Sequence, residues 1–524
     1  MTESLAWALA RAALVAGDRT AVIDGDVVLD YAELARRVDG LGGGLQSLGV
    51  AKGDVVGVLA LNGHRHLEHW LGVPAIGAVL NDLNFRLGED ELAFVLDDCR
   101  TAVLAVDDTH LEVGRRLRER CEALHTLVHL GPGPAPDGLA SHDELVHHPA
   151  ATPVPLVPDD IGGIFYTGGT TGRPKGVLLS HRNLVANAKH ALQALRHLPD
   201  DRYLHAGPMF HLADGSQTYA VTWMAGVHVF VPSFDADLVG RVIEREQVTM
   251  TLIVPSMINM LVNHAGTAHR DLSSLRLLIY GASPMPAQLQ QTAMKLLPCE
   301  FTQLYGMTEA APLLTQCSPE DHRRGAAGEE PYAGRLRSAG APVIGVQAEV
   351  RREDGTRAEV GEVGEVWARG PNIMRGYLNR PEETAAALDD DGWYHSGDAA
   401  WADEHGYLYI VDRVKDMIIS GGENVYSAEV ENVLHAHDGV LEAAVIGVPD
   451  ERWGEHVHAV VVPRPGGEPS AEELVEHCRR RLGGFKVPRG VEFRTEPLPK
   501  SGAGKVLKRE LRAPYWAGEE RQVH

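Results

Sequence analysis

The sequence predicts an α/β protein: a large N-terminal domain of layered sheets and helices with a β subdomain, and a small α+β domain at the C-terminal end. Three observations lead to this class. Segments with helical spacing alternate with short apolar runs, which is typical of layered α/β proteins. Residues 340–411 change to a β-like composition, and residues 412–524 again mix helix and strand patterns. With 524 residues the chain also exceeds one ordinary core, so at least two domains are expected.

The first 130 residues follow the alternating pattern. Leu34, Val38, Leu41 and Leu45 have the spacing of one helix face, so we expect a helix over residues 31–48. The next runs predict a strand over residues 55–61 and a helix over residues 66–78.

Two features of the first 158 residues are expected to carry no chemistry. Residues 131–158 are rich in proline, glycine and alanine without periodicity, so we interpret them as a surface linker between subdomains. His64, His66 and His69 resemble a metal cluster, but they stand among residues expected to be solvated at a helix start. We do not expect a metal there.

Beyond residue 158, several apolar segments end in glycine and polar residues. The elements expected here are a helix over 184–195, a strand over 203–208, apolar segments over 221–231 and 250–254, and strands over 276–280 and 301–304. Open α/β sheets bind ligands at the carboxyl ends of their strands. We therefore expect several strand ends to converge on one edge.

The remaining elements belong to the β subdomain and the C-terminal domain. They are expected as strands over 346–351, 365–369 and 407–411, a helix over 427–435, strands over 443–448 and 459–462, and a helix over 470–482. Ser470 and Glu473 have the spacing of a capping box at the start of the last helix.

Composition excludes several classes of function. The net charge of −23 argues against a nucleic-acid partner, because such binding relies on basic neutralisation of phosphates. The five cysteines are scattered without CxxC spacing, which suits a reducing compartment and gives no sign of structural zinc. We find no secretory signal and no apolar run long enough to span a membrane, so a cytoplasmic location is expected.

The most informative stretch is Tyr166-Thr167-Gly168-Gly169-Thr170-Thr171-Gly172-Arg173-Pro174-Lys175-Gly176. Apolar runs enter and leave it, so it is expected to be a loop between two strands. Its glycines let backbone N–H groups approach a ligand closely, and its hydroxyls and lysine suit a polyphosphate. A P-loop is excluded, because that motif requires a helix after its Gly-Lys-Ser/Thr.

This stretch closely resembles the phosphate loop of the adenylate-forming enzymes, which include acyl- and aryl-CoA synthetases, peptide-synthetase adenylation domains and firefly-type luciferases. The resemblance covers about residues 20–512, with the motifs in family order. It implies ATP, Mg²⁺ and coenzyme A as cofactors. The residues that it assigns to the phosphates of ATP are Thr167, Gly168, Gly169, Thr170, Thr171, Gly172 and Lys175.

Further motifs extend the implied site. Tyr305-Gly306-Met307-Thr308-Glu309 matches a second family motif, in which Thr308 suits a phosphate oxygen and Glu309 suits Mg²⁺. The tyrosine ring can lie against a purine, beside a backbone strip at Gly281, Ala282 and Ser283. His211, after Pro208-Met209-Phe210, would form a gate between the acid and ATP sites.

The last matches lie in the C-terminal half. In Trp393-Tyr394-His395-Ser396-Gly397-Asp398, Asp398 would bind the ribose hydroxyls with help from Arg413. The family's hinge position falls on Lys415, which implies an N-terminal domain over 1–411, a hinge over 412–416 and a mobile lid over 417–524. Gly421 resembles the glycine that the pantetheine arm passes, and Lys505 the lysine that catalyses adenylation.

The implied activity is an ATP-dependent acid–CoA ligase, which forms an acyl-adenylate and then a thioester. The acid is left open, because residues 211–231, 254–261 and 304–313 offer both apolar and polar side chains, including Asp214, Gln217 and His228. One alternative is a family member with a non-CoA acceptor, for example in amide formation or nitrite-dependent diazotisation. Others are a luciferase-type oxygenase and a non-catalytic nucleotide sensor. The oligomeric state is also open, a homodimer included.

Overall fold

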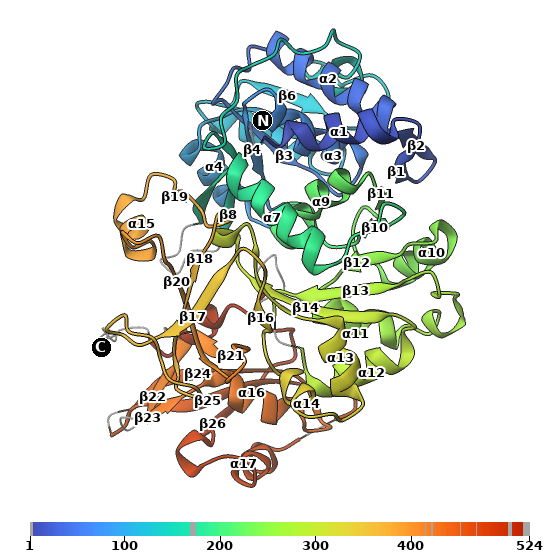
Figure 1. The fold of residues 1–524 in the computed structure, drawn as a ribbon. Coiled ribbons are helices and arrows are strands. Elements are labelled where there is room, and N and C mark those ends of the chain that lie inside the picture. Colours follow the sequence, from blue (N-terminus) through green and yellow to red (C-terminus); the bar gives the residue numbers. More distant parts are fainter. Residues whose placement is uncertain are drawn as a thin grey trace.

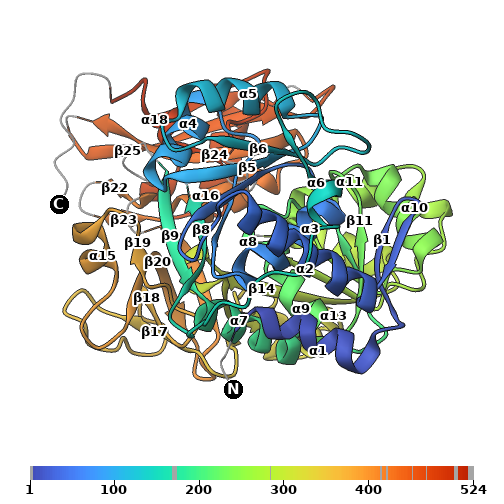
Figure 2. The same ribbon diagram turned by 90° about the horizontal axis from the view of Figure 1, so that it is seen from above.

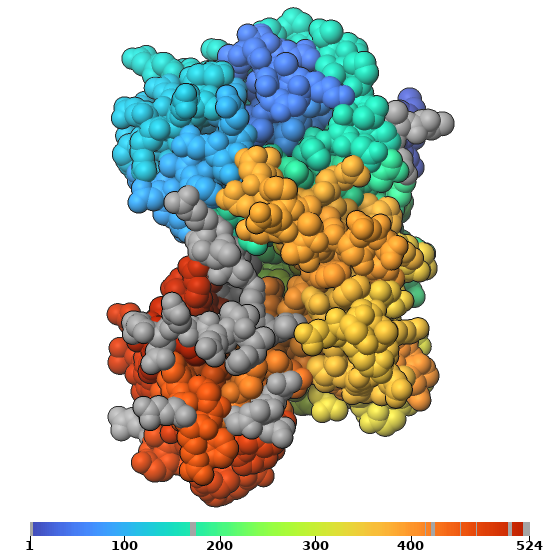
Figure 3. All heavy atoms as spheres, turned by 90° about the vertical axis from the view of Figure 1, so that its left-hand side faces the viewer, coloured from blue at the N-terminus to red at the C-terminus, as the bar shows by residue number. Residues whose placement is uncertain are grey.

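The structure, a computed structural model, describes residues 4–167, 174–283, 285–413, 416–420, 423–450, 452–467, 469–500 and 506–516. Two large sheets with their helices form most of the N-terminal domain, and the β subdomain lies beside them (Figure 1). The C-terminal domain lies below the first sheet and next to the β subdomain (Figure 3). The predicted α/β class is thereby confirmed.

The first sheet joins eight strands in the described part of the chain. Across the sheet they are β19 (Gly376–Tyr377), β9 (Lys175–Ser180), β8 (Ile161–Thr167), β4 (Val79–Asp82), β3 (Val55–Leu59), β5 (Thr101–Val106), β6 (Thr126–His129) and β7 (Ala140–Ser141). Every residue of β3 and β4 is buried, as expected of parallel strands covered on both faces. The helices of this region are α1 (Ala6–Ala16), α2 (Tyr31–Ser47), α3 (His64–Ala75), α4 (Glu89–Asp98), α5 (Leu111–Arg120) and α6 (His142–Leu145).

The second sheet joins nine described strands. In order they are β16 (Ala341–Pro342), β15 (Leu313–Cys317), β14 (Glu300–Gly306), β13 (Leu277–Gly281), β12 (Met250–Leu252), β10 (Arg202–His205), β11 (Val227–Phe230), β1 (Thr20–Asp24) and β2 (Val27–Asp30). Strands β10 to β14 run parallel to one another, so their carboxyl ends meet at one edge, as predicted.

Helices accompany this second sheet between and around its strands (Figure 2). They are α7 (His181–Ala194), α8 (Leu212–Gly215), α9 (Gln217–Met224), α10 (Ala236–Glu246), α11 (Pro255–Asn263), η1 (Thr267–His269), α12 (Ala287–Leu296), η2 (Thr308–Ala310), α13 (Pro319–Ala326) and α14 (Tyr332–Arg335). One core cluster combines buried residues from both sheets, among them Val22 of β1 and Val56 of β3. The two sheets are therefore joined by shared apolar packing.

The β subdomain is an antiparallel sheet followed by the C-terminal domain. Its elements are β17 (Gln347–Arg351), β18 (Gly364–Arg369), β20 (Tyr394–Ala402), β21 (Leu408–Arg413) and α15 (Pro381–Ala387). Those of the C-terminal domain are β22 (Ile418–Ser420), β23 (Glu423–Val425), α16 (Ser427–His435), β24 (Val440–Asp450), β25 (Gly454–Pro463), α17 (Ala471–Arg479), η4 (Gly484–Lys486), β26 (Gly490–Phe493) and α18 (Lys508–Arg512). Ser470 caps α17 by accepting a bond from the Glu473 N–H at 3.1 Å.

The C-terminal domain has apolar cores of its own. Val445 and Val457 belong to one cluster, whereas Ile446 and Val460 belong to another on the opposite face of β24 and β25. This alternation follows from the two-residue period of strand side chains. A polar contact also joins the domain to the end of β21, because the Ser427 hydroxyl donates to Asp412 at 2.5 Å.

The predicted linker over residues 131–158 is wrong in its role. This segment contains β7 and α6 and lies against helix α2. A Cβ at Gly40 would stand 2.2 Å from the Val146 carbonyl oxygen, and one at Gly43 would stand 1.9 Å from that of Pro149. The glycines of α2 therefore allow close backbone contact, and the segment is a packed part of the first domain.

The three histidines of α3 are buried, so the predicted solvated surroundings are also wrong. His64 pairs with Asp24 at 2.6 Å and His66 with Asp82 at 2.8 Å, while His69 bonds to a backbone carbonyl. They serve separate partners, and the described residues hold no metal-like group of three or more His, Cys, Asp or Glu. Nor does any helix within the described ranges have the length and apolar character needed to cross a bilayer.

Candidate active site

The phosphate-loop stretch joins two antiparallel strands, as predicted. β8 pairs with β9, and the last pair of their register is Thr167 with Lys175. Gly168, Gly169, Thr170, Thr171 and Gly172 lie outside the described residues. The structure thus defines the strand residues at the two ends of the loop. The roles of the loop residues in ATP binding remain predictions.

Lys175 lies between an acid and an aromatic ring. Its Nζ forms an ion pair with the Glu383 carboxylate of α15 at 2.9 Å and stands 5.2 Å from the centre of the Tyr377 ring. The lysine side chain is only 17% exposed. Pairing of β19 with β9 brings these partners to the loop, because Tyr377 is opposite Val177.

Tyr377 also contacts the residue predicted to hold Mg²⁺. Its hydroxyl donates a hydrogen bond to Glu309 Oε1 at 2.9 Å. Burial and the nearby Glu309 charge raise the pKa of the Tyr377 phenol, so the group stays a proton donor. Sequence reasoning missed Tyr377, and a lone Gly-Tyr pair offered no signal that would have singled it out.

The donor set at Glu309 fits a magnesium ion that is held mainly by a nucleotide. Mg²⁺ in phosphate-transfer sites is bound by one or two carboxylates, by water and by the phosphates of its substrate. Glu309 supplies one half-buried carboxylate, and Thr308 precedes it on the short helix η2. Bound there, the ion would neutralise charge on the phosphates.

The backbone that leads to Glu309 is held tightly. A Cβ on Gly306 would lie 1.8 Å from the Pro312 carbonyl oxygen, so no larger residue fits. The Met307 N–H donates to the same oxygen at 3.0 Å. The predicted motif therefore forms a closed turn at the carboxyl end of β14.

Asp398 interacts with two of the other predicted residues. Tyr305 donates its hydroxyl to one carboxylate oxygen at 2.7 Å, and Arg413 pairs with the other at 2.9 Å. The Asp398 charge, against the opposing effect of burial, raises the pKa of the Arg413 guanidinium. β20 and β21 place the acid and the arginine opposite each other. A carboxylate oxygen can accept two hydrogen bonds, so each oxygen of Asp398 has room for one more donor.

The predicted adenine strip lies at the carboxyl end of β13. Gly281 is opposite Leu304 of β14, and a Cβ there would meet the Leu304 carbonyl oxygen at 2.2 Å. Ala282 has a φ of 64°, a left-handed conformation that turns the chain away from the sheet. Ser283 is partly exposed beside it. The strip is thus next to the strand that carries Tyr305.

His211 is the N-cap residue of helix α8, at the carboxyl edge of the same sheet. Its Nδ1 accepts a bond from the Ala213 N–H at 3.1 Å. The preceding Phe210 meets Phe85, which follows β4 of the first sheet, edge-on, with ring centres 5.0 Å apart. A narrow hollow lies close by, lined by Phe85, Arg86, Ala206, Pro208, Pro232, Ser233, Phe234 and Met257.

Two polar residues considered for the acid pocket point elsewhere. Asp214 and His228 are almost fully buried, and both bond to His205. They belong to an internal network rather than an open pocket.

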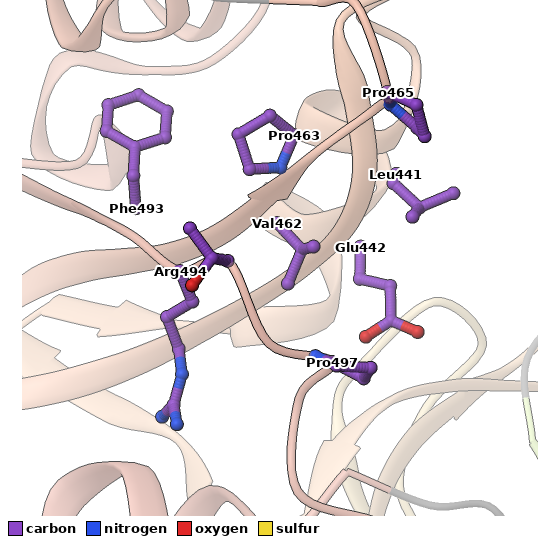
Figure 4. Close-up of a pocket in the computed structure, with 9 residues that line it drawn as sticks. Leu441, Glu442, Val462, Pro463, Pro465, Phe493, Arg494 and Pro497 are labelled. Atoms are coloured by element: carbon purple, nitrogen blue, oxygen red, sulfur yellow. The ribbon is translucent and has the colours of Figure 1, made fainter.

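Lys505, Gly421 and Lys415 lie outside the described residues. The segment that contains Lys505 is bounded by a bridge between Lys500 and Val506. At its start, the Leu498 N–H donates to Glu442 at 2.9 Å. Glu442 also lines a surface hollow of about 420 Å³ on the C-terminal domain, with Leu441, Val462, Pro463, Pro465, Phe493, Arg494, Thr495 and Pro497 (Figure 4). None of these lining residues belongs to the predicted site.

Comparison with known proteins is consistent with this arrangement. The profile of a family described as AMP-binding enzyme matches residues 9–378, and that of its C-terminal domain matches residues 429–505. A feruloyl-CoA synthase from Amycolatopsis is 42% identical and covers 97% of this chain and 98% of its own. The long-chain-fatty-acid–CoA ligase FadD13 of Mycobacterium tuberculosis is 36% identical, covering 98% and 99%.

A solved structure gives the same result for the fold. The amide bond synthetase McbA from Marinactinospora thermotolerans superposes with a TM-score of 0.87 at 31% identity, covering 98% of this chain and all of its own. This chain therefore belongs to the AMP-binding enzyme family, in the acyl-CoA synthetase branch of the adenylate-forming enzymes.

Proposed function

We propose that this ATP-dependent acid–CoA ligase acts on an aromatic carboxylic acid. The choice of an aromatic acid rests on the side chains near His211, described below. The ATP site itself rests on the contact of Tyr377 with both Lys175 and Glu309. It joins the predicted phosphate-loop lysine to the predicted magnesium carboxylate, although 134 positions separate the two in the sequence. A site for a nucleoside triphosphate needs both groups near one phosphate chain.

The reaction has two steps. A carboxylate oxygen attacks the α-phosphorus of ATP, which forms an acyl-adenylate and expels pyrophosphate. The thiol of coenzyme A then attacks the acyl carbonyl, and AMP leaves with the bonding electrons. Because two anions meet in the first step, the protein must hold them together and place positive charge between them.

The described residues divide this work among themselves. Lys175 and Thr167 would bind the pyrophosphate part of ATP, and Glu309 would hold Mg²⁺. Asp398 and Arg413 would fix the ribose, since a buried carboxylate with an arginine partner orients hydroxyl donors well. Gly281, Ala282 and Ser283 would form the wall beside adenine.

We assign the charge placed between the two anions to Lys505. The described residues that flank it, Lys500 and Val506, belong to the C-terminal domain, which has separate apolar cores. A rotation about Lys415 would withdraw Lys505 after adenylation and bring Gly421 to the thiol. This division gives a domain over 1–411, a hinge over 412–416 and a lid over 417–524.

Aromatic side chains near His211 support an aromatic substrate. Phe85 and Phe234 line the narrow hollow beside it, Phe210 meets Phe85 edge-on, and flat rings pack against such walls edge-on or offset. The 42% identity to a feruloyl-CoA synthase, above the 36% to a fatty-acid ligase, points the same way.

The five cysteines are free thiols, which supports a reducing, cytoplasmic location.

A panel of acids tests the proposal. Pyrophosphate release should be fastest with cinnamic-type or other aryl acids, and a thioester should form when coenzyme A is present. Faster turnover of unbranched alkyl acids would overturn the aromatic assignment. Formation of an amide, but no thioester, when an amine is offered would favour the activity named for the structural neighbour McbA.

A further inference from the structure

We infer that Asn62 and Asp214 are positioning residues that hold His211 from two sides. The inference rests on the proposed function, in which His211 stands between the acid and the nucleotide. Asn62 lies in the turn after β3 of the first sheet, whereas Asp214 belongs to helix α8 beside the second. Together they fix the turn that carries His211.

Asn62 follows β3 and is only 7% exposed. Its side-chain N–H groups donate to the carbonyl oxygens of His205 at 3.2 Å and Gly207 at 2.7 Å. Its side-chain oxygen accepts a bond from the Met209 N–H at 2.9 Å. All three bonds reach backbone groups within the six residues before His211, so this one side chain sets the path of the chain into the turn.

Asp214 holds the other side of the turn. Its carboxylate is buried and accepts a bond from the Tyr203 hydroxyl at 3.0 Å and from His205 Nδ1 at 2.7 Å. Its backbone N–H donates to the His211 carbonyl oxygen at 3.0 Å. A movement of Asp214 would therefore move the first turn of α8 and with it the imidazole of His211.

A buried chain of hydrogen bonds extends this anchor into the sheet. His205 Nε2 lies 3.0 Å from His228 Nδ1, and His228 Nε2 lies 3.0 Å from the Thr222 oxygen. Thr222 has one proton and donates it to the Thr218 carbonyl oxygen at 2.7 Å, so His228 Nε2 must donate. Burial lowers the pKa of His228, which keeps it neutral with Nδ1 as an acceptor.

His205 therefore donates from Nε2 to His228, and its Nδ1 lies 2.7 Å from an Asp214 carboxylate oxygen. Both residues are buried, and a buried polar group that loses its hydrogen-bond partner is costly to the fold. Asp214 is thus held by internal partners, which suits a rigid anchor more than a substrate contact.

The test is a double-mutant cycle with His211. Asn62→Ala and Asp214→Asn should each slow ATP–pyrophosphate exchange about 10- to 100-fold, the loss expected when a reacting group is displaced by about an ångström. Neither should slow a His211→Ala enzyme further, because both act through His211. Tyr203→Phe is a milder change, so it should slow exchange by a smaller factor and likewise not slow the His211→Ala enzyme further.

Asp201→Asn is the matched control. Asp201 is also buried and bonded, to Arg276 at 2.6 Å, but it lies beside the opposite end of β10. This variant should lower thermal stability like Asp214→Asn while leaving the exchange rate unchanged. An Asp214→Asn loss that multiplies the His211→Ala loss would overturn the inference, as would equal kinetic losses for the two aspartate variants.

The ring NMR signal of His211 separates this inference from the proposed function. Asn62→Ala and Asp214→Asn should shift that signal, and Asp201→Asn should not, whether or not the wild-type chain activates any acid. An unmoved signal contradicts the positioning roles of Asn62 and Asp214. Absence of exchange in the wild type with every acid contradicts the proposed function alone.

Discussion

The phenol oxygen of Tyr377 lies 2.9 Å from a carboxylate oxygen of Glu309, while its ring stands 5.2 Å from the ammonium of Lys175. One side chain thus links the two charged groups that are expected to meet the phosphates of ATP. Both links arise because the short strand β19 adds to the edge of the first sheet at β9. An element of two residues therefore joins the β subdomain to the phosphate loop.

Replacing Tyr377 by phenylalanine separates the two links. The ring over Lys175 remains, but the hydrogen bond to Glu309 is lost. Since such a bond contributes ~1 kcal/mol, the ATP concentration needed for half-maximal exchange should rise about fivefold, and more Mg²⁺ should reduce the effect. Titration of ATP and Mg²⁺ measures this, with Tyr409→Phe as the control. The same values for both variants would exclude a role for the hydroxyl.

Glu383 pairs with Lys175 at 2.9 Å and should compete with the phosphates of ATP for this cation. In the Glu383→Ala variant the lysine is released, so ATP should bind more tightly. The gain should be about 2- to 5-fold, because partly exposed ion pairs are worth up to ~1 kcal/mol. Calorimetric titration with ATP measures it. Weaker binding would instead mean that Glu383 orients the lysine.

Asp398 is expected to recognise the ribose. Asp398→Asn keeps the shape of the side chain but removes the charge opposite Arg413, so ATP should bind about 10- to 100-fold more weakly. The wild type should also prefer ATP to 2′-deoxy-ATP, and the variant should lose much of this preference. Competition between the two nucleotides reports it directly. Full discrimination by the variant would place the ribose elsewhere.

A buried carboxylate away from the site governs acid stability. Burial alone would raise the pKa of Glu68, but hydrogen bonds from His142 and Arg37, with their charges, lower it to about 2. The folded pKa lies below the unfolded value of about 4.3, so the group stabilises the fold above pH 4.3. That contribution, about 3 kcal/mol, is lost as the pH falls through 4.3 toward 2.

Glu68→Gln should therefore be less stable than the wild type at neutral pH. The difference in unfolding free energy should shrink as the pH falls from 4.3 toward 2. Denaturant unfolding followed at several pH values measures it, with Glu89→Gln, at a partly exposed surface position, as the control. A difference that stays constant over this range would contradict the low pKa of Glu68.

Local patterns predicted most of the fold. Helical spacing between Leu34 and Leu45 identified α2, and residues 427–435 proved to be helix α16 with the same bounds. The prediction of a linker over 131–158 was wrong because composition alone cannot show that the glycines of α2 allow the backbone of this segment to pack closely against the helix. The predicted solvation of the α3 histidines was wrong for a related reason, since their partners Asp24 and Asp82 lie on other elements.

The candidate site was also predicted only in part. Asp398, Tyr305 and Arg413 were predicted from separate motifs, and the structure brings them into one hydrogen-bonded group. Tyr377 and Asn62 were missed, because each acts through contacts with residues distant in the sequence. Contacts of this kind depend on the order of the strands in the sheets, which cannot be predicted from local sequence spacing.

The central claim is that a single ammonium, carried by the C-terminal domain, serves adenylation and then withdraws. Lys505→Ala tests it most directly, with the two half-reactions measured separately. The variant should lose formation of acyl-adenylate from acid and ATP, yet convert a supplied acyl-adenylate and coenzyme A to thioester at nearly the wild-type rate. Equal loss of both half-reactions would contradict the account.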